Sequence, residues 1–233
     1  MPRTVSDLRT EIRYEANLTD KDLPDADLLR LINKYYQELV TDVVRVNEDR
    51  FYEIATSDLV ANQQEYTLPR KVLADSSTTE AIKVKRVELN YTGADPTTAK
   101  HIDVNEIEDS TDQETVNNNF DQNEPFFDMV EQSIFIFPIP TTDIVGGFLL
   151  HYIERPDDLV ADSDAPHAGL PVGYHYLIVE GTLKDIGRRF RKTDLEDRAR
   201  AGYDRGRAEM VTELEVSALN EDLAFRALND YEA

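Results

Sequence analysis

The residues of this chain best suited to acid–base or metal chemistry are its four histidines, His101, His151, His167 and His175. None is spaced like the His-x-x-x-His pairs that hold zinc on a helix, and the sequence has no Gly-x-Ser-x-Gly motif or glycine-rich phosphate loop. With 0 cysteines, a thiolate nucleophile and a cysteine metal site are excluded. We therefore expect surface or capping roles for His151, in a strand, and His175, at a helix start. We expect no catalytic residue, cofactor or metal, and hence no enzyme.

Four aspartates lie close together in the later part of the chain, at Asp157, Asp158, Asp162 and Asp164. Their carboxylates could coordinate a calcium ion, because calcium prefers oxygen ligands. The segment lacks the glycine and the distal glutamate of an EF-hand loop, however. We therefore favour a solvated acidic loop over a calcium site.

Eight basic residues gather late in the sequence: Arg188, Arg189, Arg191, Lys192, Arg198, Arg200, Arg205 and Arg207. They could bind an acidic protein surface or DNA. The alternative is pairing within helices, because Asp185, Glu196 and Asp204 lie three or four positions from a basic residue, and each such pair contributes about 0.2–0.5 kcal/mol. We favour pairing for the cluster as a whole. Arg188, Arg189 and Arg191 are the candidates for contact with a partner, since few acidic residues surround them.

The overall charge is strongly negative, with 47 acidic and 25 basic residues and a net charge of -22. Such a balance excludes a surface that coats DNA, because DNA binding requires neutralisation of phosphates by basic side chains. Three explanations stay open. The protein could come from a halophilic source, where salt screens carboxylate repulsion over about 3 Å at 1 M; the charge could serve ordinary solubility; or the negative field could have a function.

The length of 233 residues, with 40% hydrophobic composition, suits one main domain with appendages. No apolar run approaches the roughly 20 residues of a membrane-spanning helix. The opening Met-Pro-Arg-Thr-Val-Ser-Asp lacks the apolar core of a secretory signal. We expect a soluble chain without a membrane partner.

The apolar spacing at both ends of the sequence predicts helices that would position these charged groups. A short first helix is expected after Thr4, which is suited to cap it, and a long amphipathic helix is expected from Asp25 through Val43. Pro171 is suited to the first turn of a later helix that extends to Ile186. Thr193 or Asp194 can cap a further helix running through Leu214.

The middle of the chain predicts strands, because its apolar residues alternate. We expect a hairpin from a strand at 51–60 and a return at 65–68, and a bulge near Lys85-Arg86 in a strand at 82–91. A single helical turn at 103–108 is expected next, followed by a mobile polar loop at 109–124.

A second hairpin is expected around Glu131-Gln132, between strands at 126–130 and 133–137. Its second strand should finish at Phe137, because Pro138 cannot donate to a ladder. A last strand at 147–154 should end before Pro156. The sequence thus predicts about six strands between two pairs of helices.

The predicted fold class is α+β, with N-terminal and C-terminal helices packed as a small bundle and a central, mainly antiparallel β domain. The predicted domains are 1–49 for the N-terminal helices, 50–156 for the β domain with its polar insertion at 109–124, and 157–216 for the loop and helices that complete the bundle. Residues 217–233 form a C-terminal arm.

Several short motifs occur within these elements. They are Asp27–Tyr36 (DLLRLINKYY), Ala61–Pro69 (ANQQEYTLP), Ile134–Pro140 (IFIFPIP), Leu149–Pro156 (LLHYIERP), Leu170-Pro171 and Tyr174–Leu183 (YHYLIVEGTL). In order and spacing, from about residue 27 to 215, they resemble the head-to-tail connector (adaptor, neck) proteins of tailed bacterial and archaeal viruses. The polar insertion at 109–124 and the acidic bias depart from that pattern and leave the subclass open.

This resemblance implies a structural virion protein that forms a ring of about twelve copies, matching the symmetry of the portal. The ring would link the portal to the next neck or tail component, extend the DNA channel and complete the head. The implied partners are the chain itself, the portal protein, the next neck or tail protein and double-stranded DNA in transient passage. The implied location is the neck of the virion, after assembly in the host cytoplasm.

Within such a ring, an acidic lumen wall would repel phosphate and keep the DNA passage slippery, whereas a basic wall would retain DNA by counterion release. For any single carboxylate we still favour generic solvation over a role in the lumen. The basic candidates Arg188, Arg189 and Arg191 would contact the acidic rim of the portal or DNA.

The C-terminal arm carries five large apolar residues, Leu219, Leu223, Phe225, Leu228 and Tyr231. Burial of each would contribute about 1.5–3 kcal/mol, so a free tail is unexpected. The arm should dock either on its own subunit or, as the resemblance implies, on the portal, which we favour. The alternative function is an acidic cellular binding protein, such as a DNA mimic that occupies a basic partner.

Overall fold

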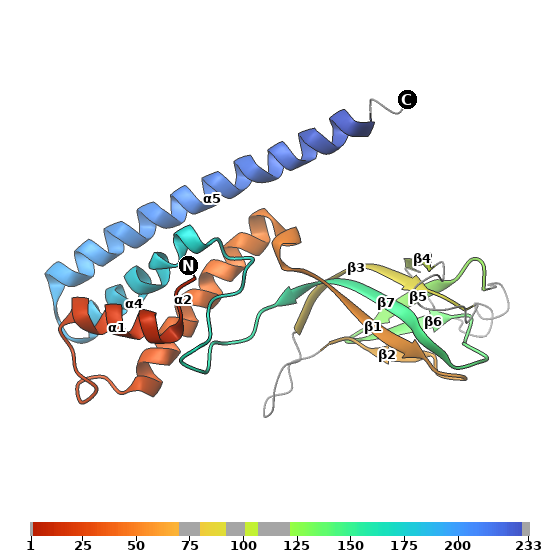
Figure 1. Ribbon diagram of the computed structural model, residues 1–233, viewed down its shortest axis with the longest axis horizontal. Helices are drawn as coiled ribbons and strands as arrows, with labels where there is room; N and C mark the ends of the chain where they lie inside the picture. Colours follow the sequence, from red (N-terminus) through yellow and green to blue (C-terminus); the bar gives the residue numbers. More distant parts are fainter. Residues whose placement is uncertain (1, 70–79, 92–100, 107–121, 230–233) are drawn as a thin grey trace. The chain divides into compact units, whose positions relative to one another are not determined.

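The computed structural model describes residues 2–69, 80–91, 101–106 and 122–229, with side chains described as far as residue 218. The chain divides into two compact units (Figure 1): a helical unit of Met1–Phe51 with Pro156–Ala233, and a β unit of Tyr52–Arg155. Helices occupy both ends of the sequence and strands occupy its middle, which confirms the predicted α+β class. Among the described residues, no helix combines the length and the apolar composition needed to cross a membrane.

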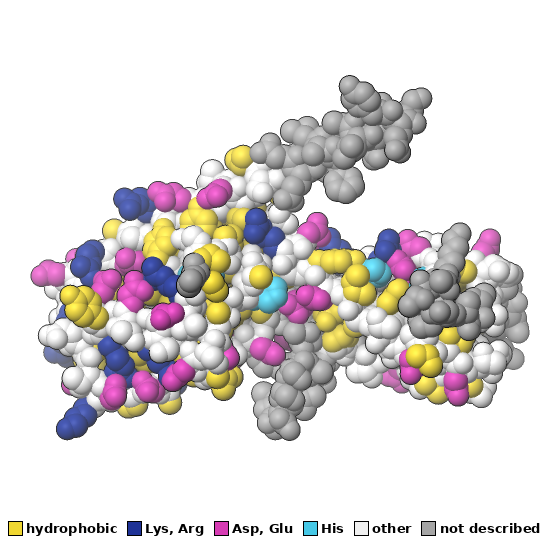
Figure 2. All heavy atoms as spheres, in the orientation of Figure 1, with side chains coloured by type: hydrophobic (Ala, Val, Ile, Leu, Met, Phe, Trp, Pro, Cys, Tyr) yellow, Lys and Arg dark blue, Asp and Glu magenta, His cyan; other side chains and the backbone are white. Residues whose placement is uncertain are grey.

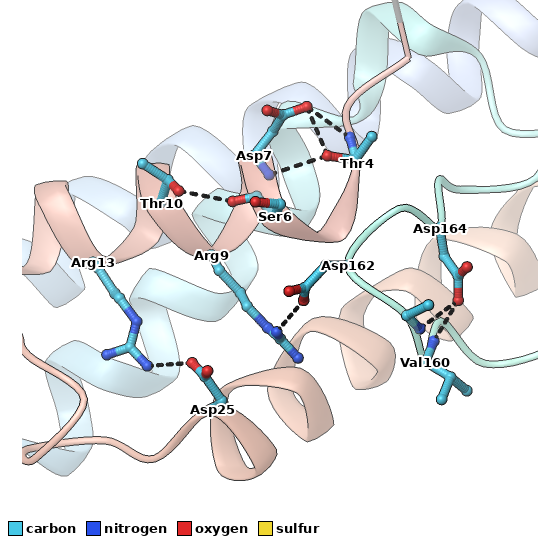
Figure 3. Close-up of polar contacts among 11 residues, drawn as sticks. Thr4, Ser6, Asp7, Arg9, Thr10, Arg13, Asp25, Val160, Asp162 and Asp164 are labelled. Atoms are coloured by element: carbon cyan, nitrogen blue, oxygen red, sulfur yellow. Dashed lines mark hydrogen bonds and ion pairs between the residues drawn. The ribbon is translucent and has the colours of Figure 1, made fainter.

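The helical unit begins with α1 (Val5–Ala16), and Thr4 caps it as predicted. The Thr4 hydroxyl accepts from the Asp7 N–H at 3.2 Å, and the Asp7 carboxylate accepts from the Thr4 N–H at 2.9 Å, which forms a capping box (Figure 3). Helix α1 ends at Asn17, whose φ of 48° is the left-handed conformation that asparagine tolerates. The sequence therefore fixes both ends of this helix locally.

The long second helix, α2 (Asp25–Val46), buries the apolar stripe that the sequence predicts, including Leu28, Ile32 and Val43. A short 3₁₀ turn, η1 (Glu48–Phe51), follows it. Pro171 leads into a second 3₁₀ turn, η2 (Val172–Tyr174), rather than directly into a helix, and α4 (Tyr176–Arg189) starts after it.

The last helix, α5 (Thr193–Asn229), is 37 residues long and buries Ala199, Tyr203, Met210 and Leu214 at helical spacing. Its backbone continues as a helix through positions 217–229, which belong to the predicted arm. The side chains of the arm residues lie outside the described part of the chain.

Glycines allow the helices to approach closely at two crossings. A Cβ on Gly181 of α4 would lie 2.3 Å from the Tyr35 ring of α2, and a Cβ on Gly206 of α5 would lie 2.3 Å from the Tyr176 hydroxyl. Real Cβ atoms do not come so near another heavy atom, so any side chain at these positions would push the helices apart. The packing of α2, α4 and α5 thus depends on these glycines.

The β unit is a curled seven-stranded sheet with the strand order β1-β7-β3-β4-β5-β6-β2 (Figure 1). The strands are β1 (Tyr52–Leu59), β2 (Glu65–Thr67), β3 (Glu80–Leu89), β4 (Ile102–Glu106), β5 (Phe126–Val130), β6 (Ser133–Phe137) and β7 (Ile144–Arg155). Among these pairs only β4–β5 is parallel. Apolar side chains such as Leu59, Val87, Phe127, Ile136 and Leu150 form its core.

The predicted hairpin between 51–60 and 65–68 is wrong. Strand β1 pairs with β7, and β2 pairs with β6, so the short connection carries the chain from one end of the strand order to the other. The Tyr66 ring stacks on Phe148 at 5.1 Å between centroids, and its hydroxyl accepts from the Val60 N–H at 3.0 Å. This aromatic packing and the long-range pairs replace the local hairpin.

The predicted helical turn at 103–108 is also wrong, because residues 102–106 form β4. Val104 is 5% exposed and pairs with Val87 of β3, whereas its neighbours Asp103 and Asn105 are exposed. Such alternation is the period of a strand. Positions 107 and 108, and most of the predicted polar loop, lie outside the described residues.

Other strand predictions are confirmed. Strand β3 has a register shift between Val84 and Arg86, where the bulge was expected, and a second one between Ala81 and Lys83. The β5–β6 hairpin turns through two residues, with Val130 paired to Ser133, and β6 ends at Phe137. The turn lacks glycine, and Glu131 adopts a φ of 56° instead.

Candidate functional site

Most of the predicted basic cluster is engaged with acidic groups inside the helical unit. Arg200 pairs with Glu196 as predicted, and Arg205 pairs with Glu209 at 3.7 Å. Two other pairs join elements far apart in the sequence, since Arg198 meets Glu15 at 2.9 Å and Lys192 donates to the Ala16 carbonyl at 2.5 Å. Basic and acidic side chains accordingly intermingle on the face shown in Figure 2.

Arg207 pairs across helices instead of with Asp204, contrary to the prediction. Its Nε and Nη2 donate to the two carboxylate oxygens of Asp42 in α2 at 2.5 and 2.8 Å, and its Nη1 donates to Glu38 at 2.7 Å. Asp42 is only 6% exposed. The hydrogen bonds from Asp42 raise the pKa of Arg207 further above its ordinary value. This guanidinium joins α5 to α2 and is not available to a partner.

Arg188, Arg189 and Arg191 lie where α4 ends and the connection to α5 begins. The side chains of Arg188 and Arg189 are 70% and 52% exposed, and their closest carboxylate oxygens, on Asp185 and Asp27, are 3.4 and 3.9 Å away. Exposed pairs at such distances contribute little to stability. Both guanidinium groups can therefore exchange these contacts for those of a partner at small cost.

Arg191 occupies an unusual backbone position. Its φ is 56°, and the next residue, Lys192, donates its N–H to the Gly187 carbonyl at 2.8 Å. Helices that end in this left-handed conformation normally place glycine or asparagine there, and another residue costs about 1–2 kcal/mol. Arg191 is exposed, and within the described part of the chain no acidic side chain pairs with it. The cost would be offset if the guanidinium contacts another molecule.

The histidines have structural contacts. His101 lies 3.1 Å from the Gly146 carbonyl, and His167 stacks on Phe51 at 5.1 Å. His175, at the start of α4, makes no capping hydrogen bond; its buried ring lies 3.3 Å from the Leu170 carbonyl, and burial lowers its pKa. The capping role predicted for His175 is wrong.

His151 is buried rather than on the surface, and it lies at the centre of a polar network on the outer face of β1, β7 and β3. Its Nδ1 contacts the Tyr52 hydroxyl, and its Nε2 lies 3.2 Å from a Glu88 carboxylate oxygen. Arg86 pairs with the same carboxylate. Burial holds the pKa of His151 below its ordinary value although Glu88 acts in the opposite direction. The network links three strands and satisfies both ring nitrogens.

The aspartates of the predicted acidic loop have separate partners in the helical unit (Figure 3). Asp162 pairs with Arg9 of α1, and Asp164 accepts from the N–H groups of Val160 and Ala161 at 2.7 Å each. Asp158 accepts from Gln37 at 3.1 Å. These contacts attach the loop to α1 and α2, while Asp158 and Asp162 remain exposed to solvent as expected.

One surface has no counterpart in the sequence analysis. A pocket of about 670 Å³ lies beside the tip of the β5–β6 hairpin and the edge strand β2. Phe135, Val130 and Thr67 supply its apolar and small side chains, and Glu65 and Glu131 supply carboxylates. These positions come from the β5–β6 hairpin, which is local, and from β2, whose pairing with β6 is not. The positive φ of Glu131 could not be anticipated from a sequence without glycine or asparagine in the turn.

Comparison with protein families shows that residues 3–227 match the model described as SU10 adaptor protein. The matched range includes both units and nearly the whole chain. A comparison with curated proteins found no match. The motif order, the α+β architecture and this near-complete match agree, and the chain belongs to the SU10 adaptor family of phage structural proteins.

Proposed function

We propose that this adaptor forms a ring between the portal and the next neck or tail component, extending the DNA channel and completing the head. The observation that supports the proposal is the family match, because its range, residues 3–227, includes both units. Both units are then parts of one assembly module. The protein would act in the neck of the virion after assembly in the host cytoplasm.

A ring requires a heterologous interface, in which one face of each subunit packs on a different face of its neighbour. The chain offers dissimilar surfaces: a helical unit with interspersed charges and a β unit with an exposed apolar and polar sheet face. About twelve copies would match a portal ring of the same symmetry. Because each copy carries a net charge of -22, ring formation should be easier at high salt or on a portal template.

Portal contact is assigned to Arg188, Arg189 and Arg191, together with the arm at 217–233. The guanidinium groups are exposed and weakly paired, and Arg191 retains a backbone conformation that favours glycine. Arginine suits an acidic protein rim because its planar fork binds carboxylates through two hydrogen bonds. The backbone of α5 continues through Asn229, so most of the arm positions belong to this helix.

Carboxylates that face the lumen of such a ring would keep phosphate from adhering, although most acidic residues of the chain would be generic solvated surface. Adaptation to a halophilic environment would give the same composition. The two explanations differ in one measurement: DNA ejection after charge reversal of lumen-facing carboxylates. Unchanged ejection would favour salt adaptation.

The test is negative-stain microscopy of the purified chain with and without its portal. The expected result is a ring, either alone or only on the portal. Deletion of residues 217–233 should abolish portal binding and leave the rest of the chain folded, as judged by circular dichroism. A monomer that ignores the portal and binds a basic protein would contradict the proposal and support a DNA mimic.

A further inference from the structure

We propose that the pocket between β2 and the β5–β6 hairpin is a docking site for a short extended segment of another protein, which adds a strand to β2 and carries an arginine or lysine into the pocket. The pocket, of about 670 Å³, is formed by the outer faces of β2, β6 and β5. Strand addition to a free sheet edge gives affinity through the backbone, and a pocket gives specificity through alternate side chains.

The free edge of β2 follows from its hydrogen bonds. Strand β2 ends the strand order, and on its paired side the Ile136 N–H donates to the Gln64 carbonyl at 3.0 Å while the Leu68 N–H donates to the Gln132 carbonyl at 2.9 Å. Because bonded positions alternate in an antiparallel ladder, the backbone groups of Glu65 and Thr67 point away from β6. Among the described residues only the Gln63 side chain reaches them, at the Glu65 carbonyl. Within the described residues, the N–H and C=O of Thr67 have no other partner and can pair with a new strand.

The side chains of the pocket favour a long basic residue. An added strand would lie about 4.8 Å beyond β2. The side chain of its residue opposite Thr67 would therefore have to be long enough to extend over the small side chains of Thr67 and Ser133 into the pocket. The aliphatic part of an arginine or lysine can pack on Phe135 and Val130, which is 47% exposed, and its charge can meet a carboxylate.

Two carboxylates are placed to receive that charge. Glu65 already accepts from the Ser133 hydroxyl at 2.6 Å, which holds it over the pocket, and Glu131 projects from the hairpin tip. Glu131 holds a left-handed φ of 56° that glycine or asparagine would adopt more easily. The carboxylates of Glu65 and Glu131 therefore favour a segment that carries a positive charge.

The occupant is a different protein rather than a second copy. Within the described strands, every arginine and lysine belongs to β3 or β7. Strand β7 is paired on both sides, with β1 and β3, whereas β3 is paired with β7 along its length and with β4 only at Val87–Leu89. The basic residues of β3 are already engaged within their own chain, Arg86 with Glu88 and Lys83 and Lys85 with other groups, which disfavours β3 of another copy as the added strand. A basic neck or tail protein fits the site better.

In the experiment, a displayed library of random heptapeptides is selected for binding to the immobilised full-length chain. Two variants of the chain serve as matched controls. Thr67→Pro leaves the β2–β6 ladder intact, since this N–H faces away from β6, but it blocks strand addition. Glu131→Gly removes one carboxylate and relieves the left-handed backbone. Both variants should melt at or above the temperature of the unmodified protein.

The expected result is enrichment of peptides that carry an arginine or lysine within a β-branched or aromatic run. For the labelled leading peptide, fluorescence anisotropy should show at least a tenfold weaker Kd with Thr67→Pro and a threefold to tenfold weaker Kd with Glu131→Gly. Enrichment without a basic residue, or equal binding by Thr67→Pro, would contradict the proposal. Loss of self-association in Thr67→Pro, measured by sedimentation, would identify a second copy as the occupant and also overturn it. Either failure leaves portal binding, and hence the proposed ring function, to be judged by its own test.

Discussion

In the helical unit, ion pairs connect helices that are distant in the sequence, whereas in the described part of the β unit the ion pairs lie on β3 and β7, and apolar side chains fill the interior. Arg207 of α5 binds Asp42 of α2, and Lys34 of α2 meets Asp185 of α4 at 2.5 Å. In the β unit, the Arg86–Glu88 pair lies on the outer face beside His151, and Phe148 and Leu150 pack inside. Both units bury apolar side chains, but only in the helical unit do the described ion pairs also join separate helices.

This difference bears on assembly. A protein with a net charge of -22 must limit repulsion between its own helices, and the interhelical pairs do so locally. We propose that partners contact the groups held least firmly by such pairs: the arginines at the end of α4 in one unit, and the edge of β2 in the other. Each unit would therefore have its own kind of partner contact.

The apolar core of the β unit should give the largest effect. Phe148→Ala removes a ring that stacks on Tyr66 at 5.1 Å and is 4% exposed. We expect a loss of about 4 kcal/mol in the free energy of unfolding, since large-to-small changes in cores cost about 3–5 kcal/mol. Urea denaturation followed by tyrosine fluorescence measures it. The loss should be the same in low and high KCl; a strongly salt-dependent loss would show that charges also hold this interior together.

Gly181→Ala tests the helix crossing in the other unit. A Cβ there would lie 2.3 Å from Tyr35, so the new methyl group must displace the ring or the helix. We expect a loss of about 3 kcal/mol, at the upper end of overpacking costs, in denaturation followed by far-UV circular dichroism. Gly173→Ala is the matched control, because nothing lies within 4 Å of its Cβ position. If both variants were equally stable, close packing would not explain the glycine at 181.

Asp42→Asn tests the charges between helices. The substitution leaves the guanidinium of Arg207 with a neutral partner at a position that is 6% exposed. We expect a loss of about 2 kcal/mol, below the usual cost of breaking a fully buried pair because Arg207 keeps Glu38 and is partly solvated. Arg205→Ala removes only an exposed pair and should change stability by about 0.5 kcal/mol or less. The same loss from both substitutions would contradict a special role for the α2–α5 pair.

The comparison also shows what sequence can predict. The helices of the first unit follow from local signals: the Thr4 cap, the apolar stripe of α2, and the spacing of Ala199, Tyr203 and Met210 in α5. Each of these signals is contained within one helix. The hairpin at Glu131 was equally local, because its two strands adjoin in the sequence.

The strand order and the ion pairs were not accessible in the same way. Pairing of β1 with β7 and of β2 with β6 depends on which distant strands bury Tyr66 and Leu59, and no local pattern encodes it. Asp204 lies at helical spacing from Arg207, so the sequence favours a pair that the approach of α2 replaces with Asp42. The candidates for portal contact could be predicted only because few acidic residues surround these arginines in the sequence. The β2 pocket could not be predicted from the sequence.

Glu180 gives a smaller, pH-dependent test within the helical unit. One of its carboxylate oxygens is buried without a hydrogen-bond partner among the described residues. Burial raises its pKa, Glu15 and Glu11 act in the same direction, and Arg198 opposes them. Because the pKa of Glu180 is higher in the folded state than in the unfolded state, folding favours the protonated acid. The contribution of Glu180 to the free energy of unfolding therefore becomes more favourable as the pH falls from neutral towards the unfolded-state pKa.

Glu180→Gln should therefore raise the free energy of unfolding at pH 7 by about 1 kcal/mol, the lower range for a buried unsatisfied group. The gain over the unmodified protein should shrink as the pH is lowered. Paired denaturation curves at pH 7 and pH 5 measure it. A constant difference between the two pH values would mean that Glu180 does not titrate there.

Arg191→Gly should give the smallest change in stability, and it distinguishes an effect on folding from an effect on portal binding. Glycine adopts the φ of 56° without strain, but it loses more chain entropy on folding. The free energy of unfolding should therefore rise by only about 0.5 kcal/mol. Portal binding should weaken at the same time, because the exposed guanidinium is lost. Arg205→Ala is the control, since it removes an exposed arginine from α5 without changing the end of α4. Thermal melts together with pelleting on portal rings would measure both effects. A variant that is more stable and binds the portal as well as before would show that Arg191 makes no contact there, and the arginine at this backbone position would have no explanation in assembly.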